Sequence, residues 1–268
     1  MPNEDRVRIE TVDGIADVRM VRGDKMNAVD LDMFIALIDA GLEIAEDKKV
    51  RVVVLSGEGR AFCSGLDIPS LMSGGVDRSG PNLLDRTPES PANIAQRCAW
   101  VWQEVPVPVI AAVHGVAYGA GFQIAMGADI RYVAPDARLS IREAHWGLIP
   151  DVAATQTARH VVGLDVLKEL TFTGRVVSGT EAKELRIATH VSEAPHADAM
   201  VLAKEIASRN PHAVRAGKQL WNQAFQGTIE EGLKLETELQ KRLLGSPNQV
   251  EAVKANMQKR EPKFEDPK

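Results

Sequence analysis

A chain of 268 residues with 44% hydrophobic and 26% charged residues is long enough to bury a large apolar core, and this composition excludes collagen, coiled coils and disorder. The 32 basic and 37 acidic residues give a net charge of −5, so no overall basic field exists to hold nucleic acid or an anionic membrane. The two cysteines, Cys63 and Cys98, cannot build a disulfide framework, and no apolar run approaches the length of a signal or spanning helix. We therefore expect a cytoplasmic protein with neither nucleic-acid nor membrane partners.

The first half of the chain alternates strand and helix patterns. Residues 6–20 predict two strands joined by a turn at Asp13 and Gly14, and Asp30 is placed to cap an amphipathic helix that runs to the charged segment 46–49. Residues 51–56 are apolar without alternation, which is typical of a strand covered on both faces. A helix at 92–104, a second buried strand at 107–115 and a third strand around 128–135 complete an α/β pattern.

The rest of the chain does not continue the alternation of strand and helix patterns. Segment 73–91 is rich in Gly, Ser and Pro, which favours a mobile lid or surface loop. After residue 151 helical patterns dominate, with one short strand at 188–193, and they cover residues 154–162, 165–171, 180–186, 197–208, 211–225, 228–244 and 247–258. We expect an α/β core at 1–195 and a helical region at 196–268.

Two glycine-bearing turns follow strands and open helices. GEGRAFCSGLDI (57–68) precedes a helix expected at 66–72, and small residues at 119–121 begin an apolar helix within IAAVHGVAYGAGFQIAMGADI (110–130). Neither segment carries the G-x-G-x-x-G spacing or a phosphate-loop Lys with Ser/Thr. Alone, the first segment could be an ordinary helix entry capped by Asp67. Together, the two turns could hold one carbonyl oxygen between two backbone N–H groups.

AFCSGLDI and the 110–130 segment resemble the crotonase superfamily, the enoyl-CoA hydratase/isomerase family, and the resemblance extends from the N-terminal hairpin to the final KREPKF. It implies a spiral of β-β-α units followed by a C-terminal helical trimerisation region, and a homotrimer or dimer of trimers. The implied substrate is an acyl-CoA thioester, so coenzyme A arrives with the substrate and no cofactor is held permanently. The six histidines show no metal spacing, so we expect no metal.

The resemblance also implies roles for single residues. The peptide N–H groups of Leu66 and Ala120 would form an oxyanion hole for the thioester carbonyl. Contacts to coenzyme A would come from Lys25, Met26, Arg60, Ala61, Ser64 and Leu66. Taken singly, Lys25 and Arg60 could equally be solvated surface charges.

The carboxylates favour one reaction over another. Hydratases of the family use two glutamates, but Gln123 stands at the first position, and an amide cannot exchange a proton at ordinary pH. Glu143 matches the second position, and Asp151 resembles an aspartate of the dienoyl-CoA isomerases, although those relatives carry an aspartate where Gln123 lies. We therefore prefer an isomerase closest in site pattern to that group.

Four alternatives stay open at this point. Glu143 could be a surface carboxylate on a short helix, and Asp151 could cap the next helix. The chain could also be a hydratase in which Asp151 replaces the missing glutamate, or a catalytically silent acyl-CoA binder.

Overall fold

The computed structural model describes residues 5–69, 82–86 and 88–268. The chain begins with the expected hairpin, in which β1 (Val7–Val12) and β2 (Ile15–Met20) pair antiparallel. Asp13 and Gly14 turn the chain between them, both with positive φ. Such dihedrals suit the Asp-Gly pair, so this turn follows directly from the sequence.

A six-stranded sheet with the order β1-β2-β3-β4-β6-β9 forms the centre of the molecule. Its remaining strands are β3 (Val52–Gly57), β4 (Val109–Val113), β6 (Ile130–Val133) and β9 (His190–Val191), and from β2 onward neighbouring strands run parallel. Alternate residues of β3 enter different cores: Val53 and Leu55 on one face, Val52 and Val54 on the other. The prediction of a strand covered on both faces is confirmed.

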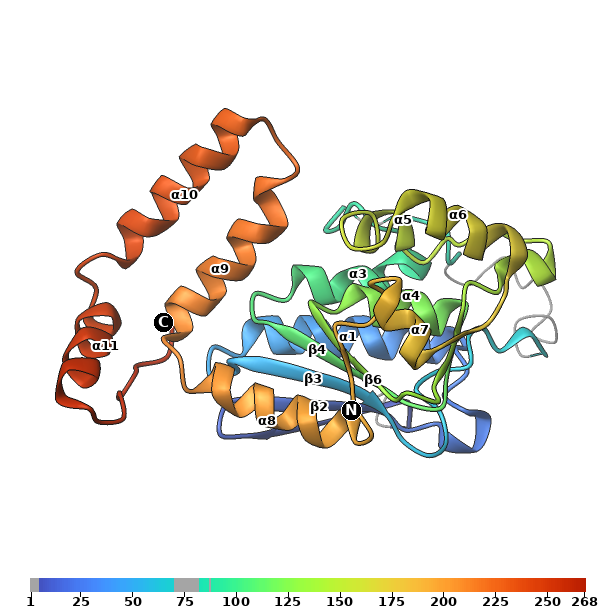
Figure 1. Ribbon diagram of the computed structural model, residues 1–268, viewed down its shortest axis with the longest axis horizontal. Helices are drawn as coiled ribbons and strands as arrows, with labels where there is room; N and C mark the ends of the chain where they lie inside the picture. Colours follow the sequence, from blue (N-terminus) through green and yellow to red (C-terminus); the bar gives the residue numbers. More distant parts are fainter. Residues whose placement is uncertain (1–4, 70–81, 87) are drawn as a thin grey trace.

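Helices cover both faces of this sheet (Figure 1). On one face lie α1 (Leu31–Glu46), α3 (Ile94–Glu104) and α4 (Ala120–Gly127), whose apolar side chains share the larger core. On the other face α8 (Pro195–Ala207) buries Ala199 and Ala203 against the sheet. Asp30 caps α1 as expected, because its side chain accepts a hydrogen bond from the Met33 N–H.

A second, three-stranded sheet was not foreseen. The strand expected at 107–115 ends at Val113, and after a turn at Gly115, where φ is +61°, the chain continues as β5 (Val116–Tyr118). This strand pairs with β7 (Arg138–Ser140), which pairs with β8 (Val177–Ser178). Strands of two or three residues are too short to show an alternating pattern, so their pairing depends on tertiary contacts.

The later helices agree with the sequence in order, with shifted ends. They are α5 (Ala154–Thr157), α6 (Leu164–Thr173), α7 (Gly179–Glu184), α9 (Pro211–Ala224), α10 (Ile229–Leu243) and α11 (Pro247–Gln258), and short 3-10 helices lie at Gly23–Lys25 and Glu143–Trp146. The α5 helix is shorter than the expected 154–162, because the chain turns before Gly163.

Helices α9 to α11 project from the body that holds the two sheets (Figure 1). Buried Lys218 ties α9 to the core through Asp129 at 2.9 Å and the carbonyls of Trp102 and Val107. The C-terminal tail returns to the sheet, where Arg51 binds Asp266. The boundary expected between residues 195 and 196 stays a prediction; it would fall after the first residue of α8, and α8 lies on the sheet.

Some expectations fall outside the described residues, namely most of segment 73–91 and the end of the helix expected at 66–72. Leu66 does not begin that helix, because it pairs with Val29 as an isolated parallel bridge. Across the described ranges, no helix is long and apolar enough to cross a membrane. Nor do three or more His, Cys, Asp or Glu side chains of those ranges gather where they could hold a metal ion.

Candidate active site

The two glycine-bearing turns dock onto one another. Cys63 donates its N–H to the Val116 carbonyl at 3.0 Å and accepts from the Tyr118 N–H at 3.1 Å. Gly121, in the first turn of α4, approaches the Cys63 carbonyl so closely that a Cβ would lie 2.3 Å from its oxygen. The small residues singled out in the sequence therefore serve this contact between backbones.

Leu66 and Ala120 present unpaired N–H groups at the junction of these turns. Val29 bonds to the carbonyl of Gly65 and to the N–H of Asp67, so in this parallel bridge the N–H of Leu66 points away from Val29. Ala120 is the first residue of α4, where no intrahelical acceptor exists. Among the described residues neither N–H has an acceptor.

The two donors lie on neighbouring stretches of backbone. Gly65 adopts φ +94°, and a Cβ there would lie 2.7 Å from the Tyr118 oxygen and 3.8 Å from the Ala120 nitrogen. Only glycine allows this conformation and this approach. Stabilisation of a developing oxyanion requires two free N–H groups close together, and these two neighbouring, unpaired donors are candidates for that role.

Glu143 lies beside the Ala120 turn. It belongs to the 3-10 helix that follows β7, and only 7% of its surface is exposed, so the alternative of a surface carboxylate is wrong. A Cβ on Gly119, which has φ +51° and ψ −117°, would lie 3.3 Å from Glu143 Oε1. The arrangement is held by the Gly119 N–H, which donates to the Ser140 carbonyl at 2.9 Å, and by Arg142, whose guanidinium lies 5.0 Å above the Tyr118 ring.

Gln123 connects Glu143 to the segment that carries Asp151. Its Nε2 donates to Glu143 Oε1 at 2.6 Å, and its Oε1 accepts from the N–H groups of Val152 at 2.8 Å and Ala154 at 3.4 Å. Gln123 is fully buried, and the Oε2 of Glu143 is buried without a hydrogen-bond partner among the described residues. The sequence indicated that Gln123 cannot move protons, but it carried no signal of these contacts.

Both carboxyl groups have raised pKa values. Burial raises the pKa of Glu143, the charge of Asp151 adds to the rise, and hydrogen bonds from the backbone and from Gln123 oppose it. Desolvation by the surrounding protein also raises the pKa of Asp151, which lies at the solvent edge of the site. Asp151 does not cap the next helix, since the N-cap of α5 is Ala153 and the N–H of Ala154, at the start of that helix, bonds to the side chain of Gln123 instead. Raised pKa values bring carboxyl groups toward the range in which they exchange protons.

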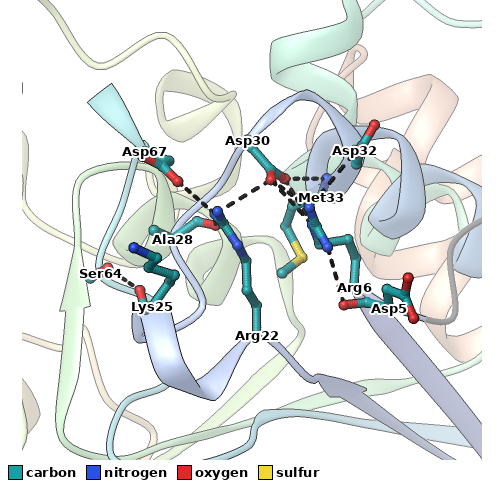
Figure 2. Close-up of polar contacts among 10 residues, drawn as sticks. All are labelled: Asp5, Arg6, Arg22, Lys25, Ala28, Asp30, Asp32, Met33, Ser64 and Asp67. Carbon is teal, nitrogen blue, oxygen red and sulfur yellow. Dashed lines mark hydrogen bonds and ion pairs between the residues drawn. The ribbon is translucent and has the colours of Figure 1, made fainter. Parts of the chain in front are cut away.

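The residues expected to contact coenzyme A lie around the first turn. The Ser64 N–H donates to the Met26 carbonyl at 2.9 Å, and Ser64 Oγ lies 3.4 Å from the Lys25 carbonyl oxygen (Figure 2). Lys25 and Arg60 have exposed side chains, whereas the side chain of Ala61 is fully buried. The backbone of Ala61 is buried as well, and its carbonyl already accepts a hydrogen bond from Asn27, so contact between Ala61 and a ligand stays a prediction.

Supporting residues around this turn were missed. Buried Asn27 donates to the carbonyls of Glu58, Ala61 and Phe62 at 2.9–3.1 Å and thereby shapes the turn. Arg22 joins Asp67, at 2.8 Å, to Asp30, at 3.4 Å (Figure 2). Asn27 stands in the K-M-N-A stretch beside two candidate residues, but an amide and an arginine give no local pattern that reveals such partners.

Two cavities of about 770 and 800 Å³ lie elsewhere, one between α9, α10 and the C-terminal tail and one between α3, α5 and α9. Glu143, Asp151 and Ala120 line neither of them. The N–H donors and the carboxyl groups of the candidate site therefore lie outside both cavities.

Comparison with known proteins places this chain in a family. The family model described as "Enoyl-CoA hydratase/isomerase" matches residues 10–267. This chain belongs to that family. The crotonase resemblance is therefore confirmed, and the protein is an enzyme of the isomerase or hydratase type.

Relatives of both types are similar to the chain. The peroxisomal Delta(3,5)-Delta(2,4)-dienoyl-CoA isomerase of Arabidopsis thaliana is 32% identical over 265 residues, covering 96% of this chain and 95% of that protein. The mitochondrial methylglutaconyl-CoA hydratase of Mus musculus is 29% identical over 272 residues, covering 97% and 84%. The names of these two relatives place them in organelles, so a cytoplasmic location for this enoyl-CoA hydratase/isomerase family member stays a prediction.

Solved structures confirm the mixed α/β crotonase-like fold. A putative enoyl-CoA hydratase from Streptomyces coelicolor A3(2) has a TM-score of 0.87 at 30% identity, covering 99% of this chain and 96% of that one. An enoyl-CoA hydratase from Bacillus anthracis has the same TM-score at 26% identity, covering 97% and 98%. The family member described here thus keeps the fold over nearly its whole length.

Proposed function

We propose that this protein shifts a double bond in an enoyl-CoA or dienoyl-CoA thioester. The observation that carries the proposal is the environment of Glu143. One carboxyl oxygen is held by an amide that cannot transfer a proton, and the other is buried without a hydrogen-bond partner among the described residues. The second carboxyl group, whose charge raises the pKa of Glu143, is Asp151. Two carboxyl groups such as Glu143 and Asp151 can remove a proton from one carbon and deliver a proton to another.

The reaction balances without a co-reactant. One carboxylate removes a proton from a saturated carbon, either next to the thioester carbonyl or at the far end of a double bond conjugated with it. A C–H bond breaks, an O–H bond forms, and the electron pair moves to the thioester oxygen. The N–H groups of Leu66 and Ala120 would stabilise that oxyanion. The electron pair then returns, another carbon takes a proton from the second carboxyl group, and the double bond has moved. Glu143 and Asp151 are the proposed acid–base pair.

The same proposal assigns the binding of coenzyme A. Lys25 and Arg60 would contact its phosphates, and Met26, Ser64 and Leu66 would lie along its pantetheine arm. Buried Ala61 would support the turn that carries these residues. The exposed side chains of Lys25 and Arg60 are able to reach a solvent-facing ligand. Coenzyme A would enter and leave as part of the thioester.

We further propose a homotrimer or a dimer of trimers assembled through the C-terminal helices. These helices expose large apolar side chains, among them Trp221 (65% exposed), Ile229 (85%) and Met257 (80%). Apolar surface of this size, on helices that project from the body, favours burial against other subunits.

The second candidate is an enoyl-CoA hydratase in which Asp151 replaces the missing glutamate. Relatives named as hydratases favour it. The two functions separate in one experiment, in which a panel of 2-enoyl-CoA, 3-enoyl-CoA and 3,5-dienoyl-CoA thioesters is incubated with enzyme and the products are resolved by chromatography. Products in which the double bond has moved but no water has been added to it support the isomerase. 3-Hydroxyacyl-CoA as the main product refutes it.

A further inference from the structure

The amide of Gln123 can take only one orientation. The backbone N–H groups of Val152 and Ala154 both donate to the same terminal atom of the Gln123 side chain. That atom must be the amide oxygen, because the amide nitrogen does not accept hydrogen bonds. The NH₂ group must therefore face Glu143, where it lies 2.6 Å from Oε1. The assignment of oxygen and nitrogen thus follows from the hydrogen-bond network.

This orientation makes the two oxygens of Glu143 unequal. The Gln123 nitrogen only donates, so Oε1 must accept and cannot carry a proton toward it. A proton on Glu143 therefore resides on Oε2, which is buried and has no partner among the described residues. An unpartnered buried oxygen is costly in a resting protein, and it is suited to meet a substrate atom.

The other end of the amide holds the Asp151 segment. Between the two N–H groups that bond to Gln123, Ala153 adopts φ +63°, a left-handed conformation that is unfavourable for alanine. The hydrogen bonds to Gln123 oppose relaxation of this strained residue. One side chain thereby ties the backbone next to Asp151 to the carboxyl group of Glu143.

We infer that Gln123 is a positioning residue that selects Oε2 of Glu143 as the proton-transferring oxygen and sets the Asp151 segment against it. The inference rests on the proposed function for the identity of the reaction, but the selection of Oε2 concerns the free protein. The enzyme would then use one proton-carrying oxygen on Glu143, in place of a carboxyl pair at positions 123 and 143.

Few charged groups of the described residues face Glu143. Among those residues, Asp151 is the group whose charge raises the pKa of Glu143. Helix α4 carries no ionisable side chain, and Asp165, Lys168 and Glu169 of α6 are exposed. On its own 3-10 helix His145 is exposed, and Arg142 lies over Tyr118 of β5. A change at Gln123 should therefore appear directly in the titration of Glu143.

The decisive variant is Gln123→Met, which keeps the length of the side chain and removes both the donor and the acceptor. The matched control is Gln156→Met, because Gln156 is exposed on α5 and its side chain bonds only to Thr155. With Gln123→Met we expect kcat to fall on the order of 10²-fold, with KM within about threefold, since misplaced groups lose rate more than binding. The acid limb of the pH profile should move to higher pH, because Glu143 loses a hydrogen bond to its ionised form. Gln156→Met should match the unaltered enzyme.

Gln123→Glu is a second variant for the case in which methionine prevents folding. Its carboxylate can still accept from Val152 and Ala154, but its second oxygen would lie against Glu143 Oε1. Two carboxylates this close share one proton, so the pair should titrate in two separated steps. The acid limb of the pH profile should therefore lie at higher pH than in Gln123→Met.

The titration of Glu143 is also read without substrate, from the side-chain carboxyl signals of ¹³C-glutamate-labelled protein, with Glu143→Gln identifying the signal. A Glu143 titration and pH profile unchanged in both Gln123 variants would overturn the inference, even if the enzyme shifts double bonds. If the unaltered enzyme shifts none while the titration still responds to Gln123→Met, the proposed function fails and the positioning role stands.

Discussion

The oxyanion hole is tested most directly by Ala120→Pro, which deletes one of its two proposed donors. Ala120 is the first residue of α4, and its N–H has no acceptor in the described protein, so the substitution breaks no hydrogen bond of the fold. Proline is well tolerated at this helical position, and α8, α9 and α11 of this chain already begin with it. The preceding residue, Gly119, lacks the Cβ that a proline ring would clash with.

The expected effect is large on activity and small on stability. Removing one oxyanion donor lowers turnover about 10²- to 10³-fold, which corresponds to about 2.7–4 kcal/mol of transition-state stabilisation. The assay is kcat/KM for the best thioester of the panel, measured beside circular dichroism and thermal unfolding to show that the variant is folded.

Two variants serve as controls for Ala120→Pro. Ile229→Pro makes the same change at the first residue of α10, whose N-cap Thr228 has the extended backbone that precedes proline readily, and it should keep activity. Leu66→Ala keeps the other N–H donor and should lower kcat/KM less than tenfold. A folded Ala120→Pro enzyme with the activity of Ile229→Pro would refute the oxyanion assignment.

Three further predictions concern the carboxyl groups and the assembly. Glu143→Gln and Asp151→Asn should each lower kcat at least 10²-fold, because an amide keeps the shape of the side chain but cannot transfer a proton. The Kd for a CoA thioester, measured by calorimetry, should change by less than about threefold. Full activity in Asp151→Asn would remove that residue from the mechanism. The folded-state pKa of Glu143 is raised, so its stabilising contribution is complete below the unfolded-state pKa and is lost as the pH rises through the folded value. Thermal unfolding from pH 4 to 8 should therefore show Tm falling less in Glu143→Gln than in the unaltered protein, and equal slopes would contradict the raised pKa. Light scattering at micromolar concentration should give the mass of three or six chains, and a uniform monomer would exclude the proposed assembly.

Local sequence patterns determined the framework of the protein. The Asp-Gly hairpin, the two-faced strand β3 and the Asp30 cap each depend on residues close together in the chain, so composition and spacing were enough to predict them. The two glycine-bearing turns also carried a family resemblance, which comparison then confirmed.

Tertiary structure decided what lies around the reacting groups. The three strands of the second sheet are too short to have a pattern of their own, and they exist because the chain turns at Gly115 and later segments pair with it. Leu66 was expected to begin a helix, but it forms a bridge with Val29 that leaves its own N–H pointing away from Val29. Ala61 was expected to contact coenzyme A, but packing buries its side chain.

Gln123 shows most clearly which properties follow from the sequence and which depend on the tertiary structure. Its amide chemistry, and so its inability to carry a proton, can be read from the sequence. Its hydrogen bonds reach residues 20, 29 and 31 positions further along the chain. Contacts at such separations leave no periodic trace, because they depend on how the sheets and α4 bring distant segments together and not on any local conformational preference.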